Sequence, residues 1–183
     1  MKRAVICLVI AIPQLLLAGE STPSSSYTGQ ESRVIKSLSA EEIEALENGS
    51  GMGFAKTAEL NHYPGPKHVL DLTEQLELTP SQESRTRALY DDMRKKAVLA
   101  GQELLRAEGA LDLLFSDESV GAASLAMSLN TIGQLRAKLR FVHLEAHLRQ
   151  KDILDPNQVA KYDLLRGYQN HTSKHDSQDH GGD

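Results

Sequence analysis

Apolar side chains recur every three or four residues in two long stretches of the chain, the spacing of one side of an α-helix. The first stretch begins at Pro80 and extends to about Phe115, with apolar positions Leu89, Met93, Ala97, Ala100, Leu104, Ala107, Leu111 and Leu114. The second has Leu125, Leu129, Ile132, Leu135, Leu139, Val142 and Ala146. A short polar run, "SDESVG", separates the two. The pattern predicts an all-α fold built on a long antiparallel helical hairpin.

Shorter helices are predicted on both sides of this hairpin. In "SLSAEEIEALENG", Ser39 can cap a helix, Glu42 completes a capping box, and Asn48 followed by Gly49 ends the helix. The run "GMGFAKTAELNHYPGP" predicts one or two helical turns, and "KHVLDLTEQLEL" predicts a short helix. A last short helix is expected between residues 156 and 168. The chain should therefore contain four to five helices in all.

The same helix-start signal occurs twice. In "LTPSQ", Thr79 can cap a helix, Pro80 fits the first helical position because no N–H is needed there, and Gln82 can reach back to the main chain of the cap. In "LDPNQ", the same three positions are held by Asp155, Pro156 and Gln158. These residues need no role beyond capping to explain their presence.

The second long helix carries apolar residues on two sides. Its additional stripe consists of Ala137, Phe141, Leu144 and Leu148. A helix that is apolar on two sides needs two partners. One partner is the first helix of the hairpin. The other is either a short N-terminal helix or a second subunit, and we expect a homodimer.

Both ends of the chain differ from this helical part. Lys2 and Arg3 precede an apolar run from residue 4 to residue 18, which is shorter than the roughly 20 residues that span a bilayer. We expect residues 1–19 to be a cleaved signal peptide and the protein to be periplasmic; an uncleaved anchor is the alternative. The only cysteine, Cys7, lies in this run, so the mature chain would have no disulfide.

The remaining boundaries follow from composition. Residues 20–37 are rich in Ser and Thr, without a lasting period, and are expected to form a disordered or loosely attached arm. Residues 38–168 form the predicted helical domain. Residues 169–183 form a polar tail that we expect to be disordered, although its histidines and aspartates could hold a metal weakly.

The charge distribution argues against nucleic acid as a partner. Residues 80–151 hold 11 basic and 9 acidic side chains, whereas residues 20–79 hold 4 basic and 10 acidic ones. Residues 152–183 hold 3 basic and 6 acidic side chains. A nucleic-acid-binding domain usually has a clearly basic face, which this mildly basic middle does not provide.

An exported hairpin with these two helix starts resembles the Spy/CpxP family of periplasmic proteins, which also includes ZraP- and CnrX-like metal-responsive members. The LTxxQ motif of that family is matched in full by Leu78, Thr79 and Gln82. The second copy matches at Leu154 and Gln158, with Asp155 in place of the threonine; aspartate caps a helix equally well. The resemblance covers about residues 38–168.

The resemblance implies a small helical protein, usually a cradle-shaped dimer, that acts without a nucleotide. Such a protein holds unfolded envelope proteins or reports stress or metal to a membrane-bound signalling partner. A mildly basic hairpin with spare apolar surface is compatible with weak client contacts. The candidate contact residues are Arg85, Arg94, Lys95, Arg136, Arg140, Phe141 and Leu144. The alternative is that these are ordinary solvated charges and a dimer seam.

Histidines offer a second hypothesis, a periplasmic heavy-metal sensor or scavenger. In "HLEAH", His143 and His147 are four residues apart, so they lie on one side of a helix and could share zinc, copper, nickel or cobalt. Glu145 is turned away from the pair, which excludes the H-E-x-x-H protease arrangement. Further ligands would come from His62, His68, Met52, Glu103 or Glu108. The alternative is a packed pair of neutral histidines, with no metal.

No catalytic motif is apparent. The run "GSGMG" lacks the preceding strand and the Lys-Ser/Thr ending of a phosphate-binding loop, and no G-x-S-x-G elbow occurs. We therefore expect a protein that is not an enzyme and that requires no cofactor, with a transition metal as the one possible ligand.

Overall fold

The structure is a computed structural model that describes residues 25–168. The chain divides into two units, residues 1–31 and residues 32–183. In the first unit, the described residues 25–31 form turns and the start of a short 3-10 helix, η1 (Gln30–Ser32). The predicted signal peptide and the predicted tail, residues 169–183, lie outside the described residues.

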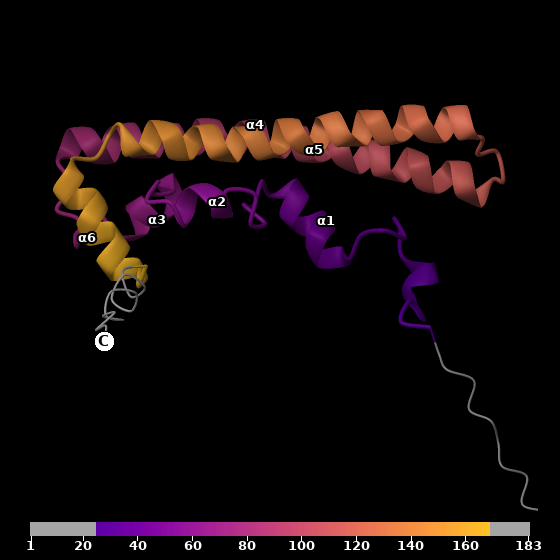
Figure 1. Ribbon diagram of the computed structural model, residues 1–183, viewed down its shortest axis with the longest axis horizontal. Coiled ribbons are helices and arrows are strands. Elements are labelled where there is room, and N and C mark those ends of the chain that lie inside the picture. Colours follow the sequence, from indigo (N-terminus) through magenta and orange to yellow (C-terminus); the bar gives the residue numbers. More distant parts are fainter. Residues whose placement is uncertain (1–24, 169–183) are drawn as a thin grey trace, which may run out of the picture. The chain divides into compact units, whose positions relative to one another are not determined.

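The second unit is built on the predicted helical hairpin (Figure 1). Helices α4 (Pro80–Ser116) and α5 (Ala122–Lys151) run antiparallel and are joined by a short turn. Their facing sides bury the apolar residues predicted to do so, among them Leu89, Met93, Ala97, Ala100 and Leu104 on α4, and Ile132, Leu139, Val142 and Ala146 on α5. No strand occurs among residues 25–168, so the all-α hairpin is confirmed.

Burial along the hairpin decreases towards the turn between α4 and α5. Leu111 is only partly buried, and Leu129, predicted to lie on the apolar side, is 51% exposed. Near the turn each helix has little besides the other helix to pack against, because α1 to α3 contact the hairpin further along its length. Helical spacing therefore predicted the correct side of α5, but not how far the core extends.

Four shorter helices complete the unit: α1 (Ala40–Glu47), α2 (Lys56–Glu59), α3 (Pro66–Asp71) and α6 (Pro156–Arg166). The described residues thus form six α-helices, where four to five were expected; the sixth is α2, a single turn in the run for which one or two helical turns were predicted. Helices α1 and α3 pack on α4, while α2 and α3 pack on α5 (Figure 1). Among the described residues no helix is long and apolar enough to cross a membrane.

The predicted helix starts adopt the expected geometry. The side chains of Ser39, Thr79 and Asp155 each accept a hydrogen bond from the main-chain N–H of the residue three positions later. In all three, the side-chain oxygen of that later residue accepts the main-chain N–H of the cap, so all three capping boxes are confirmed. Helix α6 ends at Gly167, whose φ of 75° is the left-handed conformation that glycine adopts without strain.

The packed unit begins earlier than residue 38, the boundary expected from composition. Ile35 and Leu38 are buried in the main core. Lys36 Nζ lies 3.0 Å from Asp112 Oδ2, near the end of α4. Two apolar side chains and one ion pair are enough to fix residues 33–38 against the hairpin, and a search for periodicity cannot detect so short an attachment.

Two glycines in α4 have different roles. A Cβ atom at Gly101 would collide with the main-chain carbonyl of Leu46, so this glycine allows α1 to contact α4 directly. A Cβ at Gly109 would meet only the side chain of Ile35, at 3.9 Å, which is an ordinary contact. Of these two glycines, Gly101 alone is therefore required for close packing.

A second, smaller core holds α6 in place. Val69, Leu76, Leu154 and Tyr162 are buried together. Helices α3 and α6, which carry Val69 and Tyr162, lie far from the turn between α4 and α5 (Figure 1). Since Leu154 belongs to the second helix-start signal and Leu78 of the first packs against the same cluster, the two signals meet at this core.

Candidate functional site

The two capping glutamines bind each other. Gln82 Nε2 donates to Gln158 Oε1 at 2.7 Å, and Gln158 Nε2 donates to Gln82 Oε1 at 3.1 Å. The same nitrogens also donate to main-chain carbonyls, that of Ile153 at 3.0 Å and that of Leu76 at 3.2 Å. Each Oε1 further accepts the N–H of its own cap residue at 3.0 Å. Both amides therefore use their full donor capacity and two acceptor positions.

We call this pair the glutamine joint (Gln82 and Gln158). It ties the start of α4 to the start of α6, two points far apart in the sequence. The capping role of both residues was predicted, but their pairing was not, because no local pattern tells which distant cap will lie opposite. The repeated signal therefore has a structural purpose beyond capping.

His143 and His147 lie one turn apart on the buried side of α5, 3% and 8% exposed. Burial lowers the pKa of both imidazoles below the ordinary value of 6.5, so both are neutral at pH 7. The His143 ring stacks on Phe54, with centroids 5.9 Å apart. His147 Nδ1 donates to the Tyr63 carbonyl at 2.7 Å, which leaves the lone pair on Nε2. The pair is packed and neutral in this structure.

A cavity of about 320 Å³ lies beside these rings, and its lining includes His68, His143, His147 and Met93. Gly65 also lines it, and a Cβ atom there would come within 2.8 Å of the His147 ring. His143 Nε2 is buried and has no hydrogen-bond partner among residues 25–168. We call these lining residues the histidine pocket.

Glu59, which sequence reasoning missed, lies next to His147. Its Oε1 accepts hydrogen bonds from the hydroxyls of Tyr162 and, at 3.0 Å, Tyr168, and lies 3.4 Å from His68 Nδ1. Its Oε2 lies 3.6 Å from His147 Nδ1 and has no hydrogen-bond partner among the described residues. A glutamate on a single-turn helix gives no sequence signal of burial, so no pattern could have indicated it.

The hydrogen bonds keep Glu59 ionised despite its burial. Burial alone would raise the pKa of this carboxyl, but the hydrogen bonds from His68, Tyr162 and Tyr168 outweigh it and lower the pKa to about 2. Burial and the Glu59 carboxylate together raise the pKa of Tyr162. The pocket is thus flanked by one fixed negative charge with an unused oxygen.

Of the other predicted ligands, only His68 lies at the histidine pocket within residues 25–168. His62 Nδ1 lies 2.7 Å from Asp163 Oδ2, Glu103 is paired with Lys138, and Glu108 with Arg136. Met52 lines a different cavity, whereas His68 lines the histidine pocket. Within residues 25–168, no group of three or more His, Cys, Asp or Glu side chains is placed to hold a metal ion. A shared metal would therefore require these side chains to rearrange.

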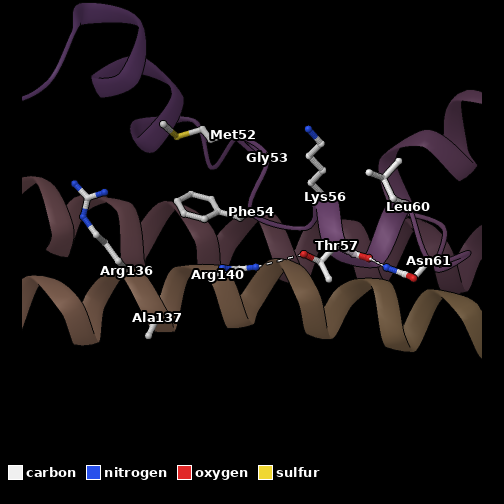
Figure 2. A pocket seen from close by; sticks show the side chains of 10 residues that line it. All are labelled: Met52, Gly53, Phe54, Lys56, Thr57, Leu60, Asn61, Arg136, Ala137 and Arg140. Carbon is white, nitrogen blue, oxygen red and sulfur yellow. Dashed lines mark hydrogen bonds between the residues drawn. The ribbon is translucent and has the colours of Figure 1, made fainter.

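An open groove of about 810 Å³ lies beside the contact between α2 and α5 (Figure 2). Its apolar lining consists of Met52, Phe54, Leu60 and Ala137, and its cationic lining of Lys56, Arg136 and Arg140. None of the lining residues in the described part of the chain is acidic. In Figure 2, Lys56 on α2 and Leu60 directly after it extend in the same direction, while Arg140 reaches from α5 towards Thr57. We call this feature the α2–α5 groove.

The predicted contact residues do not form one patch. Arg136 and Arg140 line the α2–α5 groove, whereas Arg85 lines a separate hollow with Arg149. Arg94 Nε donates to the Asn48 carbonyl at 3.4 Å. The remaining candidates, Lys95 on α4 and Phe141 and Leu144 on α5, line neither hollow; Lys95 and Phe141 are exposed and Leu144 is half-buried.

Three of the four residues of the predicted second stripe of α5, all but Leu144, are exposed in the described part of the chain. Phe141 is 61% exposed and Leu148 54% exposed. Within the described residues, no short helix covers either side chain. A short N-terminal helix, one of the two partners considered for this stripe, is therefore excluded as the cover of Phe141 and Leu148 among these residues. Since Ala137 lines the groove and Phe141 follows one turn later, the stripe continues from the groove along α5.

Comparison with protein-family models, with curated proteins and with solved structures gave no significant match.

Proposed function

We propose that this chain is a periplasmic, ATP-independent chaperone or envelope-stress adaptor of the Spy/CpxP type. The observation that carries the proposal is the uncovered apolar stripe on α5, which leads into an open groove lined by cations and apolar side chains. Exposed apolar surface next to positive charge can hold unfolded chains through contacts that are weak and easily rearranged. A homodimer, and a membrane-bound signalling partner in the case of an adaptor, belong to the same proposal.

The proposal is tested by the aggregation of an unfolding client protein, followed by light scattering without ATP. We expect the parent protein to suppress aggregation at stoichiometric amounts. A Phe141→Ser/Leu148→Ser variant should lose most of this effect, because it removes two exposed apolar side chains from the stripe.

The matched control is Leu113→Ser/Met127→Ser, which removes two similarly exposed apolar side chains near the turn of the hairpin. This variant should suppress aggregation as well as the parent does. The proposal fails if the parent does not suppress aggregation, or if both variants behave alike.

A second function, binding of a transition-metal ion, is favoured by one specific observation. Two buried polar atoms near His147, His143 Nε2 and Glu59 Oε2, have no partner among the described residues. Leaving a buried acceptor unpaired costs about 1–3 kcal/mol, and an ion is one of the usual reasons for such a group. After a rearrangement of their side chains, His143, His147 and Glu59 would hold the ion through imidazole nitrogens and a carboxylate oxygen, a donor set suited to zinc, copper, nickel or cobalt.

Calorimetric titration with these four metals tests this function. We expect His143→Ala/His147→Ala to weaken the tightest binding at least 10-fold. His62→Ala should leave it unchanged, since His62 is paired with Asp163. All these proteins carry the same histidines at residues 169–183, so weak binding by those residues affects each titration equally. Equal affinities of the parent and the double variant would exclude His143 and His147 as ligands.

A further inference from the structure

The three cations of the α2–α5 groove are not equivalent. Arg136 Nη2 lies 2.5 Å from Glu108 Oε1, and Glu108 is buried, so the charge of Arg136 is compensated within the chain. Arg140 Nη2 donates to the Thr57 hydroxyl, at 3.5 Å, and Arg140 forms no ion pair with another described residue (Figure 2). Lys56 is exposed and forms no ion pair within residues 25–168. Two positive charges, one on each wall, therefore remain available to a ligand.

The apolar part of the groove excludes a purely ionic partner. Met52 and Leu60 are exposed on the α2 side, and Ala137 on α5 leads to Phe141. A segment that carried only acidic groups would leave these side chains in water, and a purely apolar one would remove water from Lys56 and Arg140 without offering them a partner. Both needs are met by a segment that presents acidic side chains beside apolar ones.

We propose that the α2–α5 groove selects segments of client proteins in which acidic side chains flank an apolar stripe, as on an acidic amphipathic helix. This inference rests on the proposed chaperone function and names the class of segment that the groove prefers. Lys56 and Arg140 determine the selection, while Arg136 acts mainly within the fold through Glu108. The sequence candidates Arg85 and Lys95 have no part in it, because neither lines the groove.

Fluorescence anisotropy with two labelled helical peptides tests the selection. The peptides are about five turns long, with the same leucine stripe, flanked by glutamates in one peptide and by lysines in the other. The parent protein should bind the glutamate peptide at least 10-fold more tightly at low salt. The difference should shrink to less than threefold near 0.5 M salt, because screening shortens the range of exposed charges.

A charge-reversed variant assigns the selection to the groove. Lys56→Glu/Arg140→Glu should bind the two peptides within twofold of each other, or prefer the lysine peptide. The matched control, Arg85→Glu/Lys95→Glu, changes net charge by the same amount outside the groove and should keep at least a fivefold preference. All four positions are exposed, so both variants should retain the helical content and melting temperature of the parent.

Three results would overturn the inference. The first is binding of both peptides by the parent within twofold. The second is a dimer that dissociates on Lys56→Glu/Arg140→Glu, which would assign the groove to a second copy of the chain. The third is displacement of the glutamate peptide by an equal concentration of a peptide of residues 169–183, which would assign it to the chain's own C-terminal residues. If the parent still suppresses client aggregation in any of these cases, the chaperone function stands and only the selection fails.

Discussion

The glutamine joint and the histidine pocket are both polar and largely buried, but they differ in how well their polar atoms are satisfied. In the joint, the two side-chain amides bind each other, two caps and two carbonyls. In the pocket, His143 Nε2 and the nearby Glu59 Oε2 have no partner among residues 25–168. Fully paired groups stabilise a fold, whereas unpaired ones destabilise it unless a ligand uses them. The difference separates a structural element from a candidate binding site.

Gln158→Leu should produce the largest loss of stability, about 3 kcal/mol in the free energy of unfolding. The substitution leaves donors and acceptors of Gln82, Leu76 and the Asp155 main chain without partners, and each such group costs about 1–3 kcal/mol. Urea unfolding measures it as a shift of the midpoint at constant slope. The control Gln102→Leu, at an exposed position on α4, should change the midpoint little. Similar midpoint shifts for both variants would show that the glutamine joint contributes no more to stability than an exposed glutamine does.

A double-mutant cycle on the joint should give the next largest effect. Because Gln82 and Gln158 donate to each other, the loss in Gln82→Ala/Gln158→Ala should be smaller than the sum of the single losses by about 1–2 kcal/mol. Additive losses would mean that each glutamine acts only as a cap for its own helix.

In the histidine pocket, two substitutions one turn apart should change the free energy of unfolding in opposite directions. His143→Leu should stabilise the chain by about 1 kcal/mol, because it removes an unpaired buried nitrogen. His147→Leu should destabilise it by about 1 kcal/mol, because the Tyr63 carbonyl loses its donor. Thermal and urea unfolding without added metal would measure both. Destabilisation by His143→Leu would show that this nitrogen is satisfied in solution.

The smallest effect concerns pH. Since the folded pKa values of His143 and His147 lie below those of the unfolded chain, the unfolded chain binds more protons between the two values. Their contribution to stability is therefore present above about pH 6.5 and is lost as the pH falls. The contribution of Glu59, with its pKa lowered from 4.5 to about 2, is lost only below about pH 4.5.

Urea unfolding of the parent and of His143→Leu between pH 7.5 and 5 separates these contributions. The variant should lose less stability over this range than the parent does. An equal loss in both proteins would show that His143 does not resist protonation in the fold.

What the sequence predicted correctly was decided by local chemistry. The hairpin follows from residues three and four apart, and the caps follow from residues three apart, so Thr79 and Asp155 could be recognised without a structure. The glutamine joint and the position of Glu59 depend on contacts between distant segments, which no short pattern contains. The spacing of the histidines correctly placed His143 and His147 on one side of α5. It could not show that His143 Nε2 and the nearby Glu59 Oε2 lack hydrogen-bond partners among the described residues.

Hydrogen exchange of the full chain, with and without an unfolded client protein, compares the two parts of the molecule most directly. We expect the client to slow exchange in residues 52–61 and 133–148, which contain the α2–α5 groove and the uncovered stripe. Exchange at residues 79–82 and 155–158, which contain the glutamine joint, should not change. Slower exchange confined to the glutamine joint, or to the turn between α4 and α5, would contradict client binding at the α2–α5 groove and the stripe.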